Sequence, residues 1–196
     1  MKKELRKKSL LKVAYKLFIT KGYENTSVDE IINEAKIAKG TYYYYFESKE
    51  DTLEQVINMM IDEEVERANK VLNSEVSLEQ KLVGIILSLR PNINEINMQS
   101  VIHKPENIIM HKKINDRIIK EAVPLLSKVV EDGIKIGLFN CDNIQERTKM
   151  ILIMSNELFD NADNNNKYVH IFIDIVEKML GAKPGTLSFI KRLIGE

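Results

Sequence analysis

The chain has 196 residues, of which 44% are hydrophobic and 30% are charged, a composition typical of a globular protein. Its apolar runs are far shorter than the ~18 residues of a membrane span, and its basic N-terminus does not resemble a signal peptide, so we expect a cytoplasmic protein with no membrane partner. The single cysteine allows no internal disulfide. Residues 1–49 carry 11 basic and 6 acidic side chains, which fits either a polyanion-binding surface or a solvated helix face.

Helical periodicity dominates the chain and no segment has a convincing strand pattern, so the predicted fold class is all-α. An apolar stripe from Leu10 to Phe18 predicts a first helix, which Gly22 ends. Ser27 and Glu30 have the spacing of a capping box, so we expect a second, short helix to begin there.

A third short helix is predicted to begin near Lys39, after a turn of three or four residues. Ser48, with Asp51 three residues later, caps a fourth helix over residues 49–72. Two short helices joined by such a turn are typical of a helix-turn-helix, in which the second helix enters the major groove of DNA.

The rest of the chain is also predicted to be helical. The polar stretch at 73–77 separates two regions, and Ser77 with Gln80 caps a helix that ends before Pro91. The helices expected after it are a short one near 93–102, a long one from about Pro105 with a kink at Pro124, and two amphipathic ones at 143–160 and 167–180.

Residues 26–53, TSVDEIINEAKIAKGTYYYYFESKEDTL, resemble the DNA-binding signature of TetR-family transcriptional regulators. The resemblance lies in the Thr-Ser-Val opening, the apolar EII, the KGT start, the aromatic run ending in Phe, and SKE. It implies an N-terminal three-helix helix-turn-helix domain over residues 1–48 and a helical effector-binding and dimerisation domain over 49–196, connected by helix 49–72. The implied function is a ligand-responsive regulator, most often a repressor, which binds a near-palindromic double-stranded DNA operator as a homodimer.

Two positions depart from the family pattern. Lys36 stands in the turn where Gly is common, so we expect strain from a positive φ. Ala38 replaces the usual Ser at the start of the third helix, which removes about 1 kcal/mol of capping and a hydroxyl that could bond a phosphate.

The four consecutive tyrosines can be sorted by the helical repeat of about 100° per residue. Tyr42 and Phe46 share the face expected to pack against the first two helices, whereas Tyr44 points nearly opposite, on the side of Gly40. A groove-facing tyrosine offers a ring to a thymine methyl and a hydroxyl to a phosphate. From this geometry and the resemblance, the predicted DNA contacts are Thr26, Ser27 (with a capping role alone as the alternative), Lys36, Lys39, Gly40, Thr41, Tyr43, Tyr44, Tyr45 and Lys49.

The resemblance also implies a small hydrophobic or amphipathic effector and a dimer formed by the last two long helices. Methionines adapt to irregular ligands, so the candidate pocket residues, each of which also fits a core role, are Met59, Met60, Met98, His103, Met110 and Phe159. Two broad apolar stripes predict a dimer interface, with core packing as the alternative, through Ile151, Met154, Leu158, Ile173, Val176 and Leu180.

Two other classes compete with this prediction. The first is an enzyme, but we find no glycine-rich phosphate loop, nucleophile motif or paired His–carboxylate motif, so no catalytic residue is predicted. The second is a helix-turn-helix protein whose C-terminal region serves only dimerisation or partner binding, without an effector. The three histidines lack metal-site spacing, so we predict neither a metal nor a cofactor.

Overall fold

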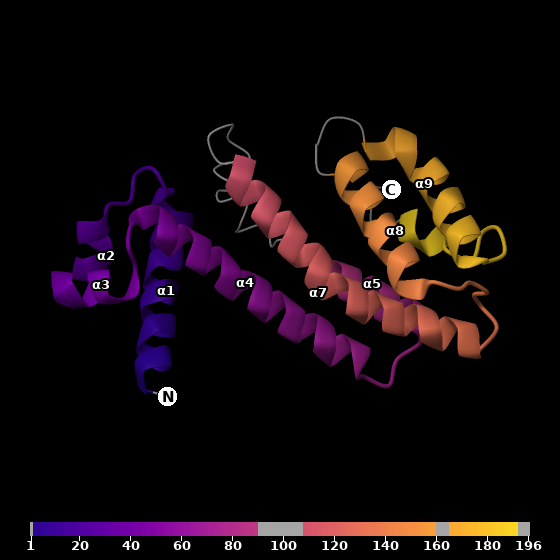
Figure 1. Cartoon of the computed structure of the whole chain (residues 1–196), viewed down its shortest axis with the longest axis horizontal. Coiled ribbons are helices and arrows are strands. Elements are labelled where there is room, and N and C mark those ends of the chain that lie inside the picture. Colours follow the sequence, from indigo (N-terminus) through magenta and orange to yellow (C-terminus); the bar gives the residue numbers. More distant parts are fainter. Residues whose placement is uncertain (1, 90–107, 160–164, 192–196) are drawn as a thin grey trace. The chain divides into compact units, whose positions relative to one another are not determined.

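The computed structural model describes residues 2–89, 108–159 and 165–191, and these residues form helices and no β-strand (Figure 1). The predicted all-α fold class is confirmed. None of the helices in these ranges combines the length and apolarity that a membrane crossing requires. The chain divides into two compact units, one built from Met1–Glu64 with the described part of 91–116, the other from the described parts of 65–90 and 117–196.

The first unit holds the predicted helix-turn-helix. Its helices are α1 (Lys2–Lys21), α2 (Val28–Glu34), α3 (Lys39–Tyr45), the first part of α4 (Lys49–Leu72) and the start of α7 (Ile108–Lys135). The division between the units falls inside α4, after Glu64, whereas the predicted domain boundary lies between residues 48 and 49.

Local sequence signals fix the helix ends in this unit. The Oγ of Ser27 accepts the N–H of Glu30, and the Glu30 carboxylate accepts the N–H of Ser27 at 2.8 Å, so the predicted capping box is present. Ser48 Oγ accepts the N–H of Asp51 at 3.1 Å and caps α4 in the predicted way. Gly22 adopts a left-handed φ of 84° directly after α1.

Both predicted irregularities of the turn before α3 are present. Lys36 has a φ of 51°, a left-handed conformation that costs a non-glycine residue about 1–2 kcal/mol. Ala38 precedes α3 without any side-chain cap. The turn is thus held by the packing of its neighbours rather than by its own residue preferences.

The core of the first unit joins all four N-terminal helices. The fully buried side chains come from each of them, with Phe18 on α1, Ile31 on α2, Tyr42 on α3 and Leu53 on α4. Because α3 is only seven residues long, it depends on this core for its stability.

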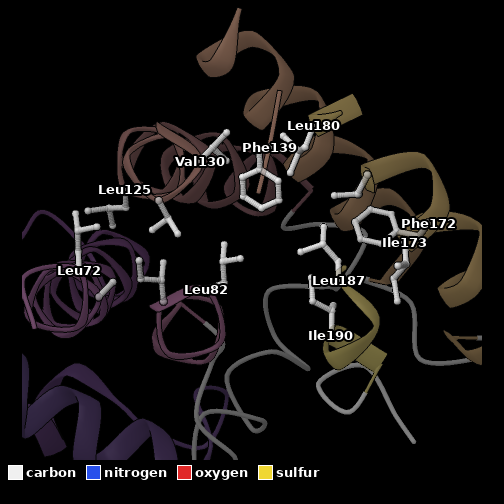
Figure 2. Close-up of a cluster of buried hydrophobic side chains, with 14 of the residues drawn as sticks. Leu72, Leu82, Leu125, Val130, Phe139, Phe172, Ile173, Leu180, Leu187 and Ile190 are labelled. Carbon is white, nitrogen blue, oxygen red and sulfur yellow. The ribbon is translucent and has the colours of Figure 1, made fainter. Parts of the chain in front are cut away.

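The second unit contains the end of α4, α5 (Leu78–Ser88), most of α7, α8 (Ile144–Phe159), α9 (Asn165–Leu180) and a short 3-10 helix (Ser188–Ile190). Its core draws side chains from most of these elements, among them Leu82, Leu125, Phe172 and Leu187 (Figure 2). The predicted capping box of Ser77 and Gln80 begins α5.

The buried carboxylate of Glu177 forms hydrogen bonds with the backbone of the segment that follows α9. Glu177, which is 5% exposed, accepts the N–H groups of Gly185 at 2.9 Å and Leu187 at 2.7 Å. These charge-assisted hydrogen bonds hold the 3-10 helix against α9 and complete the core of the second unit.

Candidate nucleic-acid interface

The four tyrosines of α3 divide between the core and the surface. Tyr42 is 0% exposed, whereas Tyr43 and Tyr44 are 50% and 64% exposed and Tyr45 is half-buried. The predicted rotation of the helix, with Tyr42 and Phe46 inward and Tyr44 outward, is confirmed. As a result, α3 presents two large aromatic rings to solvent, in a position where a nucleic acid could reach them.

Tyr42 also ties α3 to the start of α4. Its hydroxyl forms a hydrogen bond with Thr52 Oγ1, in which either oxygen can be the donor. The same hydroxyl lies within hydrogen-bond distance, 3.3 Å, of the carbonyl oxygen of Ser48, which is the acceptor. Burial of the phenol raises the pKa of Tyr42 above its ordinary value. These contacts orient α3 from its inner face.

The outer surface of the helix-turn-helix carries most of the other predicted contact residues. Lys36, Lys39 and Gly40 are exposed, and a side chain at Gly40 would meet nothing within 4 Å. The Lys39 ammonium is 3.4 Å from a carboxylate oxygen of Asp29. Since both side chains of this pair are largely exposed, the pair is weak, and a phosphate could replace the carboxylate. Thr41 is half-buried.

The two residues at the start of α2 have different surroundings. Thr26 is 1% exposed, and its hydroxyl donates to the carbonyl of Gly22 at 2.9 Å. Because the helix junction uses that hydroxyl internally, the Thr26 side chain has a structural role here, and a DNA contact by this residue stays a prediction. Ser27 is exposed and caps α2, as the alternative for this residue proposed.

Lys49 lies at the start of α4 and has partners within the chain. Its ammonium donates to the carbonyl oxygens of Tyr23 and Thr26, both at 3.0 Å, and lies 4.2 Å from the centroid of the Tyr23 ring. The Tyr23 hydroxyl in turn donates to Glu50 at 3.2 Å. Burial of Tyr23, together with the nearby Glu50 carboxylate, raises the pKa of this phenol.

This arrangement gives Tyr23 a role in positioning the start of α4, which the sequence did not predict. The only signal in the sequence was a large aromatic residue directly after Gly22. The contacts bind α4 to the loop between α1 and α2, so they favour a positioning role for Lys49.

A second link joins α1 to α2. Lys21 Nζ is 2.6 Å from Glu30 Oε1. The hydrogen bond from Lys21 and those from the backbone and side chain of Ser27 lower the pKa of Glu30 to about 2. The carboxylate that completes the capping box is therefore ionised at any physiological pH.

The predicted effector residues are described only in part. Met59 is buried and Met60 half-buried, both on α4 in the first unit, and Phe159 lies in the second unit against Phe172. Met98, His103 and the side chain of Met110 lie outside the described residues. The pocket stays a prediction. Within the described ranges, no group of three or more His, Cys, Asp or Glu side chains is arranged to hold a metal ion.

The predicted dimer residues of α9 are packed as the alternative, a core role, describes. Ile173, Val176 and Leu180 are each 5% exposed in the single chain, because they form part of its own core. They leave almost no area for a partner. The α8 residues Ile151, Met154 and Leu158 are half-buried against the same core. The exposed apolar side chains of α8 and α9 are instead Met150, Ile153, Tyr168 and Ile171.

Comparison with known proteins decides the family. Residues 10–56 match the family described as bacterial regulatory proteins, tetR family, and residues 90–177 match the tetracyclin repressor-like C-terminal domain. The chain belongs to the TetR family of transcriptional regulators. The family predicted from the residues of the second and third helices is confirmed, and the first match covers the whole helix-turn-helix.

Relatives of this TetR-family regulator are moderately similar to it. The uncharacterized HTH-type transcriptional regulator YuxN of Bacillus subtilis is 33% identical over 132 residues, which are 67% of this chain but only 40% of YuxN. The HTH-type transcriptional repressor KstR2 of Mycolicibacterium smegmatis is 27% identical over 145 residues, 70% of this chain and 69% of KstR2. The crystal structure of RolR in complex with resorcinol has the same fold, with a TM-score of 0.63, 19% identity and coverage of 100% of this chain and 97% of RolR.

Proposed function

We propose that this chain is a homodimeric repressor that binds a near-palindromic operator and releases it when a small hydrophobic or amphipathic molecule binds. The observation that carries the proposal is the outer face of α3, where Tyr43, Tyr44 and Gly40 are exposed within a helix-turn-helix that matches the family. An exposed tyrosine offers a groove both an apolar ring for a thymine methyl and a hydroxyl for a phosphate oxygen.

The geometry of α3 fits direct reading of base edges. The exposed rings of Tyr43 and Tyr44 can contact thymine methyl groups, and their hydroxyls can donate to phosphate oxygens. Gly40 lets the backbone of α3 approach the bases closely, since no side chain stands between them. Lys39 supplies a positive charge at the N-terminal end of the same helix, for a guanine edge or a phosphate.

The dimer is proposed to form through the outer surfaces of α8 and α9. Met150 and Ile153 on α8 and Ile171 on α9 are 61%, 49% and 58% exposed, so both helices offer large apolar side chains to a partner. A two-fold dimer that places two copies of α3 about 34–36 Å apart, one turn of DNA, would require a near-palindromic operator.

The effector part of the proposal draws on relatives. RolR has been crystallised with resorcinol, and another relative, 25% identical, is named the fatty acid metabolism regulator protein of Bacillus subtilis. An effector would favour a conformation in which α4 moves and the two reading helices no longer match the groove spacing. The alternative, a dimeric DNA-binding protein without an effector, keeps the same DNA surface.

The test is a selection of duplexes from a random library with the purified protein, followed by titration of the selected operator at several salt concentrations. We expect a near-palindromic sequence and a steep fall of log K with log [salt], because several phosphates are contacted in each subunit. Affinity that stays flat between low and moderate salt would contradict the DNA-binding proposal.

The effector is tested separately, by a thermal-shift screen with fatty acids, acyl-CoAs, hydrophobic cations, antibiotics and phenols. A binding compound raises the melting temperature by mass action, and it should also release the labelled operator. A compound that stabilises the protein without releasing DNA would favour the alternative without an effector.

A further inference from the structure

The face of α1 that packs into the core is apolar toward its C-terminal end and basic toward its N-terminal end. Leu10, Ala14 and Phe18 are buried on this face. Following the same face toward the N-terminus in steps of three and four residues leads to Lys7 and then to Lys3. Lys7 is half-buried and Lys3 is exposed, so the face becomes basic where α1 extends past the apolar core.

Lys3, the first of these two lysines, meets the exposed face of α3. Lys3 Nζ lies 4.6 Å from the centroid of the Tyr44 ring. The neighbouring Tyr44 phenol raises the pKa of the Lys3 ammonium above its ordinary value, which already keeps a lysine charged at neutral pH. Because Tyr44 belongs to the outer face of α3, this contact brings the positive charge of α1 to the surface that would face DNA.

We propose that Lys3 and Lys7 form a second phosphate-binding element, outside the helix-turn-helix, which contacts the DNA backbone beside the C-terminal end of α3. This inference rests on the proposed DNA-binding function. Two lysines four residues apart, about 6 Å along the helix axis, present compact positive charges that suit phosphate oxygens. Neither residue lies within the segment 10–56 that matches the family's DNA-binding region.

The size of α3 explains why a second element is useful. With seven residues, α3 is about 10 Å long, which is close to the ~12 Å width of the major groove. Lys39 begins the helix, and Lys3 lies beside Tyr44 near its end. Basic groups at the two ends can therefore meet the phosphates that border the groove on both strands.

The experiment compares single charge removals on one helix. Lys3→Gln and Lys7→Gln are measured against Lys16→Gln, which removes the same charge from α1 at a residue whose ammonium is 3.6 Å from Glu34. Fluorescence anisotropy with the selected operator and with a random duplex is recorded between about 50 and 200 mM salt. We expect the slope of log K against log [salt] to become shallower by about one for each substituted lysine in each subunit, on both duplexes.

Further measurements make the result decisive. Lys16→Gln should keep the wild-type slope, Lys3→Arg should restore it, and all variants should keep the wild-type melting temperature. Unchanged slopes in Lys3→Gln and Lys7→Gln would overturn the proposal. So would an equal loss in Lys16→Gln, which would assign the effect to net charge. Weaker operator binding with an unchanged slope would make Lys3 a positioning residue for Tyr44 instead. A flat salt response of the wild-type protein would refute the proposed function itself.

Discussion

Replacing individual tyrosines of α3 should separate folding from DNA binding. Tyr42 is fully buried, and its ring packs against Phe46 with a centroid distance of 5.3 Å. Removing such an aromatic ring costs about 3–5 kcal/mol, so Tyr42→Ala should lower the free energy of unfolding by that amount. Tyr42→Phe should cost only about 0.5–1.5 kcal/mol, because Thr52 keeps its own hydrogen bond to the Ser48 carbonyl.

Tyr44 should show the opposite pattern. Tyr44→Phe keeps the ring beneath Lys3 and changes an exposed position, so unfolding should shift by less than about 0.5 kcal/mol. Operator binding should nevertheless weaken by about 1.5–3 kcal/mol, the worth of one hydrogen bond to a charged phosphate.

The assay can be confined to the first unit without cutting the chain. The protein has no tryptophan, and six of its seven tyrosines lie within residues 1–64, so tyrosine fluorescence during urea unfolding reports mainly on that unit. Operator affinity is measured on the same samples by anisotropy. If Tyr42→Ala unfolds like the wild-type protein, or Tyr44→Phe binds like it, the assignment of these two rings to core and groove is refuted.

Three further perturbations test other parts of the structure. Ile153→Glu should yield a folded monomer, whereas Ile173→Glu should unfold the second unit because it buries a charge. Light scattering reports the oligomeric state of each variant and circular dichroism reports its folding. An intact Ile153→Glu dimer would place the interface elsewhere. Lys49→Gln should lower the melting temperature with an unchanged salt slope, and a slope shallower by about one per subunit would identify a phosphate contact instead. The pKa of the Glu30 carboxylate is lowered from 4.5 to about 2, so this group should contribute stability that is complete above pH 4.5 and lost as the pH falls through 2. Glu30→Gln should remove this pH dependence of stability from unfolding curves recorded at several pH values. An unaltered pH dependence would show that other carboxylates cause it.

The sequence by itself determined where α2 and α4 begin and how α3 is oriented. Ser27 with Glu30 and Ser48 with Asp51 specify where α2 and α4 begin, because a cap acts between residues three positions apart. The rotation of α3 also followed from the sequence, since neighbours four positions apart on a helix share a face whatever surrounds them. These are local relations, and the residues of the helix-turn-helix family signature are local in the same sense.

Only the tertiary structure decided which partner each side chain meets. Lys49 was predicted to contact DNA, and in the structure its ammonium donates to backbone carbonyls 26 and 23 residues away. The apolar stripe of α9 predicted a dimer interface, with core packing as the alternative, and in the structure Ile173 belongs to the core of the second unit. Periodicity fixes the direction of a side chain relative to its own helix. What lies in that direction depends on segments far away in the chain, and their arrangement is determined by the packing of the whole unit.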